Sequence, residues 1–156
     1  MADALVPRPP PRLLRFYRRG LVAHTALICL ISAGAYAGVL PTKSVHFPHY
    51  DLVMHFLLVG MWGFFLDGAL AHRAIANVAF FPRLGPGIAL VLAAIEETLQ
   101  RFSPRRSSTW SDFAANAIGI LFCAWMAKRL TLGKLLAEPS SGPPSVGPRG
   151  GEEGTA

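Results

Sequence analysis

The residues best suited to chemistry lie within residues 96–119, where a polar stretch separates two apolar segments. Glu97 and Gln100 are three residues apart, so they can share one face of a helix. Asp112 and Asn116 are four residues apart and can also share a face. Ionisable side chains at the edge of a membrane segment are costly and mark functional sites. Carboxylates and amides in this pattern are suited to binding a polar group or to transferring a proton.

Two further pairs extend this set. Asp51 and His55 are four residues apart at the start of an earlier apolar segment, and His55 could transfer a proton. Arg105 and Arg106 lie within the polar stretch, and a guanidinium group matches the geometry of a phosphate. The sequence therefore contains the side chains for an anion-binding pocket or for acid/base chemistry.

Transmembrane helices must position these residues. Hydrophobic residues make up 52% of the 156-residue chain and charged residues only 15%, which is typical of a membrane protein. An apolar helix of about 20 residues crosses the hydrocarbon core of a bilayer. Such segments occupy residues 20–40, 52–71, 84–100 and 111–127. We therefore predict an all-α, polytopic membrane protein, a bundle of about four transmembrane helices with short loops.

The basic residues predict how the chain is oriented. Five arginines precede the first segment, Arg73 and Arg83 lie between the second and third, and three basic residues follow the fourth. The positive-inside rule places all three groups in the cytoplasm. We expect a multi-pass membrane protein with both termini cytoplasmic. Because the net charge of +6 comes from these positions, it does not indicate nucleic-acid binding.

Polar termini flank a transmembrane domain over residues 20–130. Residues 1–19 form a basic, Pro/Arg-rich arm, predicted to be cytoplasmic, whose prolines are expected to prevent an early helix. Residues 131–156 are rich in Pro, Gly and Ser and are expected to form a disordered cytoplasmic tail. The loop between the third and fourth segments does not follow the positive-inside rule, because Arg101, Arg105 and Arg106 are placed outside. We interpret this exception as an indication that these arginines have a function.

In the predicted topology, the second and fourth helices begin, and the third helix ends, at the external surface of the membrane. The predicted binding residues are Asp51, His55, Glu96, Glu97, Gln100, Arg105, Arg106, Asp112 and Asn116. The candidate catalytic residues among them are Glu97, His55 and Asp112. A purely structural interpretation is also open, in which Asp112 caps the fourth helix, Asn116 bonds across helices and Glu97 pairs with an arginine.

A metal site is disfavoured by the sequence. Four potential ligands lie close together along the chain: His46, His49, Asp51 and His55. However, no spacing matches a zinc signature, and three nearby arginines would repel a cation. We therefore predict no metal and no cofactor.

The order of the polar residues resembles that of the VanZ-like family of small bacterial membrane proteins. The matching positions are Asp51, His55, Glu97, Gln100, Arg106, Asp112, Asn116 and Gly119. Leu52 stands where that family usually has a lysine, and Cys123 replaces a later glycine. The resemblance implies a four-helix, multi-pass protein of the bacterial inner (cytoplasmic) membrane. It is related to one that is encoded with glycopeptide-resistance genes and associated with teicoplanin resistance. The resemblance implies no catalytic residue.

Three functions remain open at this point. The first is recognition of an anionic envelope lipid, or of a cell-wall precursor, by the outward-facing cluster. The second is a membrane-embedded enzyme that cleaves or transfers an ester or phosphoester. The third is a small transporter or an assembly partner, in which Asp67 and His55 could belong to a proton path. Asp67 itself is expected at the cytoplasmic interface beside His72 and Arg73. The partners expected are membrane lipids, and the sequence predicts no oligomeric state.

Overall fold

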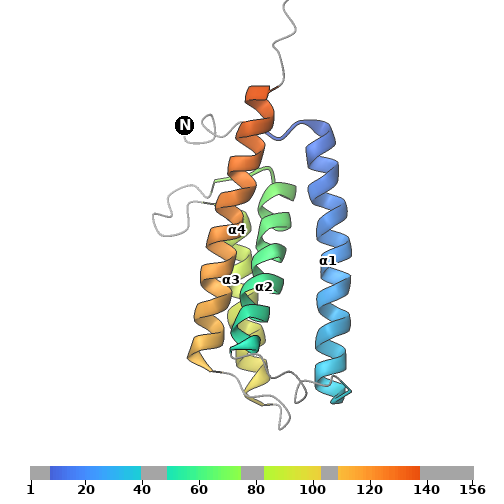
Figure 1. Cartoon of the computed structure of the whole chain (residues 1–156), viewed down its shortest axis with the longest axis vertical. Coiled ribbons are helices and arrows are strands. Elements are labelled where there is room, and N and C mark those ends of the chain that lie inside the picture. Colours follow the sequence, from blue (N-terminus) through green and yellow to red (C-terminus); the bar gives the residue numbers. More distant parts are fainter. Residues whose placement is uncertain (1–7, 40–48, 75–82, 103–108, 138–156) are drawn as a thin grey trace, which may run out of the picture.

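Four helices account for most of the residues that the structure, a computed structural model, describes: 8–39, 49–74, 83–102 and 109–137. They are α1 (Pro11–Ala37), α2 (Tyr50–Ala69), α3 (Leu84–Gln100) and α4 (Trp110–Ala137). Successive helices run in opposite directions, and α1 stands to one side of the other three (Figure 1). Within the described residues the only β-type pairing is an isolated bridge between Ala74 and Arg83. The predicted all-α bundle is confirmed.

Three of the four helices are long and apolar enough to cross a membrane: α1, α2 and α4, with 27, 20 and 28 residues. The remaining helix, α3, has 17 residues. At 1.5 Å per residue it measures about 26 Å, slightly less than a hydrocarbon core of about 30 Å. The chain is therefore a helical membrane protein. Its third predicted span is a shorter helix that packs against α2 and α4.

Two helices extend beyond their predicted ends. α1 begins at Pro11 rather than at residue 20, so the prolines of the arm do not prevent an early helix. Pro11 occupies the first helical position, where a missing N–H costs nothing and the fixed φ suits the helix. α4 continues to Ala137, so residues 131–137 are helical rather than part of a disordered tail. Residues 1–7 and 138–156 lie outside the described residues.

Glycines allow α2 and α4 to pack closely. A Cβ atom added to Gly60 would lie 2.9 Å from the carbonyl oxygen of Gly119, and one added to Gly119 would collide with the carbonyl oxygen of Phe56. Small residues are the usual means by which membrane helices approach each other. His55 precedes Gly60 by about one turn, as Asn116 precedes Gly119. The close approach therefore sets these two polar side chains opposite each other.

The centre of the bundle is apolar. The buried cluster consists of Ala89, Leu90, Ala93 and Ile120, with Val59, Trp62, Leu66 and Ala117 packed against it. Two side-chain hydrogen bonds connect α1 to α2: Trp62 Nε1 donates to Thr25 Oγ1 at 2.9 Å, and His24 Nε2 donates to the Leu58 carbonyl at 2.8 Å. Much of the remaining surface of α1 is exposed, as expected for a helix that faces lipid.

Candidate functional site

A chain of hydrogen bonds joins three helices at the end of the bundle where α2 and α4 begin. His55 Nδ1 donates to Asn116 Oδ1 at 3.2 Å, and Asn116 Nδ2 donates to Glu97 Oε1 at 3.1 Å. His55 Nδ1 also lies 3.7 Å from Glu97 Oε1. Glu97 and Asn116 are only 5% and 3% exposed, so this network is shielded from lipid and water. The structure thus places the polar stripes of α2, α3 and α4 together, as the sequence predicted.

A second pair lies beside this chain, on the α1 side. Gln100 Nε2 donates to Glu96 Oε2 at 2.6 Å, and the Tyr36 hydroxyl of α1 donates to Glu96 Oε1 at 3.5 Å. Gln100 is buried, and its Oε1 has no hydrogen-bond partner among the described residues. A buried acceptor without a donor is costly, and its presence in a native site suggests a missing ligand.

Asp112 fulfils the structural role that the sequence offered as an alternative. Its Oδ2 accepts hydrogen bonds from the backbone N–H of Thr109, at 2.9 Å, and from the Thr109 hydroxyl, at 2.8 Å. The Asp112 N–H lies 3.3 Å from the same hydroxyl, which completes a capping box at the start of α4. The carboxylate also lies next to Asp51 and His55, so capping is not its only contact.

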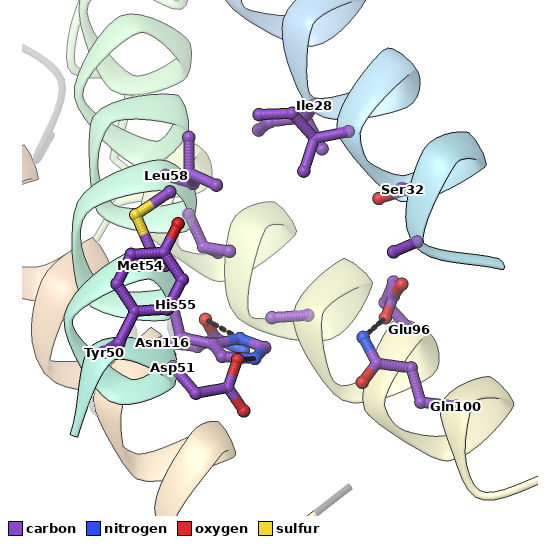
Figure 2. A pocket seen from close by; sticks show the side chains of 14 residues that line it. Ile28, Ser32, Tyr50, Asp51, Met54, His55, Leu58, Glu96, Gln100 and Asn116 are labelled. Carbon is purple, nitrogen blue, oxygen red and sulfur yellow. Dashed lines mark hydrogen bonds and ion pairs between the residues drawn. The ribbon is translucent and has the colours of Figure 1, made fainter. Parts of the chain in front are cut away.

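A cavity of about 170 Å³ opens beside these residues, between α1 on one side and α2 and α3 on the other. Its apolar wall includes Ile28 and Ile31 of α1 and Leu58 and Val59 of α2. Its polar end is formed by Asp51, His55, Glu96, Gln100 and Asn116, as Figure 2 shows. The cavity is therefore amphiphilic, with apolar and polar ends. We call the polar residues Asp51, His55, Glu96, Glu97, Gln100, Asp112 and Asn116 the cavity cluster.

Among the residues that the structure describes, the cavity cluster is rich in acceptors and poor in cations, since it holds four carboxylates and one imidazole. Arg101 is exposed, and its guanidinium lies over the Trp110 ring, 5.1 Å from the centroid, rather than in the cavity. Arg105 and Arg106 fall outside the described residues. The sequence argument that three arginines would repel a metal ion therefore does not hold for Arg101.

A second polar cluster lies at the opposite end of the bundle, and the sequence predicted only one of its contacts, the proximity of Asp67 to His72. Asp67 Oδ2 accepts hydrogen bonds from Arg83 and, at 2.7 Å, from His72 Nδ1. His72 Nε2 lies 2.9 Å from Thr131 Oγ1, and the Tyr17 hydroxyl donates to the Ala127 carbonyl at 2.9 Å. We call Tyr17, Asp67, His72, Arg83 and Thr131 the closed cluster.

The closed cluster corrects the expectation for Asp67. Asp67 and His72 are fully buried, and the partner of Asp67 is Arg83 rather than Arg73. Snorkelling to the interface is thus replaced by a buried ion pair at the start of α3. The sequence did indicate that Asp67 has a polar partner, because an aspartate inside an apolar span requires one. The sequence spacing could not identify that partner, because residues 75–82 separate the two.

The apolar centre of the bundle separates the two clusters. Ala89, Ala93 and Ile120 fill the space between α2, α3 and α4, and His24 is the ionisable side chain at the interface of α1 and α2. Within the described residues, no continuous polar path connects Asp67 to His55 through the three-helix core. The transporter hypothesis gains no support from this arrangement.

Comparison with protein-family models, with curated proteins and with solved structures finds no match. The resemblance to the VanZ-like family therefore stays a prediction. The geometry of the cavity cluster is therefore the basis for the proposed function.

Proposed function

We propose that this protein is a VanZ-like integral membrane protein of the bacterial cell envelope that recognises a lipid with an anionic headgroup. The observation that carries the proposal is the amphiphilic cavity, which has an apolar wall on α1 and α2 and a polar end at the cavity cluster. Binding pockets are mostly apolar and contain a few polar groups that fix the orientation of the ligand. A lipid has the same division into apolar chain and polar headgroup.

The apolar wall is suited to an acyl chain. Ile28, Ile31 and Leu58 line the cavity along the helix axes, and α1 stands apart from α3 and α4 (Figure 1). A chain could therefore enter from the side, between helices, without leaving the bilayer. The headgroup would then lie near His55 and Gln100, where buried polar atoms can bind it.

The arginines that follow α3 supply the preference for an anion. Arg105 and Arg106 follow the end of α3 closely in the sequence, and in this proposal they help to bind the headgroup. Guanidinium groups bind phosphate through paired hydrogen bonds. In this proposal the cluster faces outward from the inner membrane, and both termini are cytoplasmic, because the remaining basic residues lie at the other end.

Lipid binding by the purified protein tests the proposal. The affinity for a fluorescent phosphatidylglycerol should fall about tenfold or more in Arg105→Ala/Arg106→Ala, since each charge-assisted hydrogen bond contributes about 1.5–3 kcal/mol. Arg129→Ala is the matched control, because Arg129 lies over the Trp125 ring toward the other end of α4. Equal affinities of the double variant and the control would refute the proposal.

The proposed orientation has its own test. In a variant without Cys29 and Cys123, single cysteines at positions 108 and 76 should be labelled from opposite sides of the membrane. Ser108→Cys should react with an impermeant reagent added outside, and Ala76→Cys only after the cytoplasmic side is opened. The reverse pattern would place the cavity cluster in the cytoplasm.

An enzyme acting on a lipid or cell-wall ester is the second candidate. The observation that favours it is the buried Glu97 carboxylate 3.7 Å from His55 Nδ1, beside a cavity that can hold a substrate. A carboxylate and an imidazole in contact are a common acid/base pair. Under this hypothesis Glu97→Gln accumulates in the membrane normally but loses turnover of a lipid ester, whereas a binding protein shows no turnover in either form.

A further inference from the structure

Three potential metal ligands come together at the mouth of the cavity. Asp51, His55 and Asp112 each offer one ligand atom, and these atoms all lie within 4.8 Å of one another. They come from the first turns of α2 and α4, which the glycine contacts hold in register. Ligands around an ion with bonds of about 2.1 Å are about 3.0–3.4 Å apart, so small movements of the side chains would complete the site. The side chain of Asp51 is 69% exposed and free to make such a movement.

The hydrogen-bond chain behind His55 fixes the ring nitrogen that faces this site. Asn116 Nδ2 donates to the Glu97 carboxylate, so Asn116 presents its Oδ1 to His55 Nδ1. Nδ1 must then carry the hydrogen, and in neutral imidazole Nε2 holds a lone pair. Nε2 is the nitrogen that faces Asp51 Oδ1, at 3.7 Å. A metal-binding histidine typically donates its second N–H to a carbonyl or carboxylate in this way.

An independent observation on the same cavity also indicates a missing ligand. Gln100 is 3% exposed, and its Oε1 has no hydrogen-bond partner among the described residues. In Figure 2 the Gln100 amide nitrogen points to Glu96, while its oxygen points away from Glu96. That oxygen can be satisfied by a donor such as metal-bound water or a ligand hydroxyl. A cation would bind the carboxylates at the polar end of the cavity, and its coordinated water could donate a hydrogen bond to Gln100 Oε1.

The charge of the cavity cluster points in the same direction. Among the described residues its four carboxylates face one imidazole, and negative charges gathered next to a membrane are costly. A phosphate placed directly against these carboxylates would be repelled. A divalent cation between them would remove the repulsion and would offer a positive charge to the headgroup.

We propose that Asp51, His55 and Asp112 bind one divalent transition-metal ion at the polar end of the cavity, and that this ion attracts the anionic headgroup. The attraction of the headgroup rests on the proposed function, whereas the binding of the metal ion does not. An imidazole with two carboxylates suits Zn²⁺ or Mn²⁺, whereas Ca²⁺ and Mg²⁺ take oxygen ligands almost exclusively. The ligand set is compatible with an open coordination position for the headgroup.

Metal titration of the purified, chelator-treated full chain tests the site. One Zn²⁺ per chain should bind in competition with a chromophoric chelator, and the affinity should fall at least about tenfold in Asp51→Asn and in His55→Ala. Asp51 is exposed, so Asp51→Asn remains informative even if His55→Ala fails to fold. His49→Ala is the matched control, because His49 is close in the sequence but is not part of the ligand group. Stoichiometric binding that survives Asp51→Asn and His55→Ala, or no binding by the wild type, would overturn the site.

A second measurement separates the site from the proposed function. The affinity for phosphatidylglycerol should fall about tenfold or more when Zn²⁺ is removed by a chelator. In Asp51→Asn, which binds the ion more weakly, the lipid affinity should already be low at limiting Zn²⁺, and the chelator should lower it little further. Zn²⁺ binding with unchanged lipid affinity would overturn the role of the ion toward the headgroup. Zn²⁺ binding with no lipid affinity under any condition would refute the proposed function and leave the metal site established.

Discussion

The two ends of this bundle each hold a polar cluster, and the clusters differ in how their charges are balanced. In the closed cluster, the Asp67 carboxylate is paired with Arg83 and His72. In the cavity cluster, carboxylates outnumber the imidazole among the described residues, and two of them, Asp51 and Glu96, line the cavity. Removing one partner of a buried ion pair is strongly destabilising, whereas carboxylates gathered beside a cavity mark a candidate binding site. We therefore expect a structural role for the closed cluster and propose a ligand for the cavity cluster.

The closed cluster should be the more sensitive of the two to the loss of a charge. Asp67→Asn leaves the Arg83 guanidinium without its anionic partner, and breaking a buried pair costs about 3–5 kcal/mol. We expect this variant to accumulate poorly in the membrane and to unfold at a much lower detergent-denaturant concentration. Arg73→Ala is the control, because Arg73 is exposed and makes no contact with Asp67. A fully stable Asp67→Asn would mean that the ion pair does not hold this end together.

The sequence predicts residues that lie at the ends of apolar segments better than residues that lie outside these segments. The cavity cluster was predicted because its residues recur at helical spacing on the ends of apolar segments, and antiparallel helices bring those ends together. The cavity itself was not predictable, since its wall on α1 consists of ordinary residues such as Ile28 and Ile31.

Three members of the closed cluster could not be predicted from the sequence: Tyr17, Arg83 and Thr131. Tyr17 lies in the predicted basic arm and Thr131 in the predicted tail, and the two side chains lie 3.2 Å apart in the structure. Their hydrogen bonds and burial extend α1 and α4 beyond the apolar spans. Hydropathy measures the lipid-exposed length of a helix, whereas tertiary contacts outside the bilayer core decide where the helix ends.

The α2–α4 contact underlies the cavity cluster, and a larger residue should disturb it. Gly119→Leu places a side chain against the Phe56 carbonyl, and overpacking of this kind costs about 1–3 kcal/mol. Separation of the helices would also move His55 away from Asn116. Reversible unfolding in mixed micelles would measure the loss.

Gly133→Leu provides the matched control for that variant. A Cβ atom at Gly133 meets nothing within 4 Å, and leucine has a higher helix propensity than glycine. We expect this variant to be neutral or slightly more stable. If Gly119→Leu were equally well tolerated, close packing of α2 and α4 would not be what positions the cavity cluster.

A smaller effect is expected from one hydroxyl of the closed cluster. Tyr17→Phe removes a donor to the Ala127 carbonyl and a contact with Thr131 Oγ1, while the ring stays in place. The loss of one buried hydrogen bond should cost about 1 kcal/mol in the free energy of unfolding. Tyr36→Phe, near the surface, serves for comparison and should cost less, since its hydroxyl makes a bond of 3.5 Å to an exposed part of Glu96. Equal costs would show that burial does not strengthen the closed cluster.

The smallest effect on stability should come from the isosteric change in the cavity cluster. Glu97→Gln retains an oxygen that accepts from Asn116 Nδ2, and it removes one of the four carboxylates of the cavity cluster. The free energy of unfolding should therefore change by less than about 1 kcal/mol, in contrast to Asp67→Asn, which makes the same chemical change at the other end. A cost equal to that of Asp67→Asn would show that both clusters are structural. A small cost combined with altered binding of lipid or Zn²⁺ would show that the negative charge of Glu97 serves a ligand, since the fold does not require it.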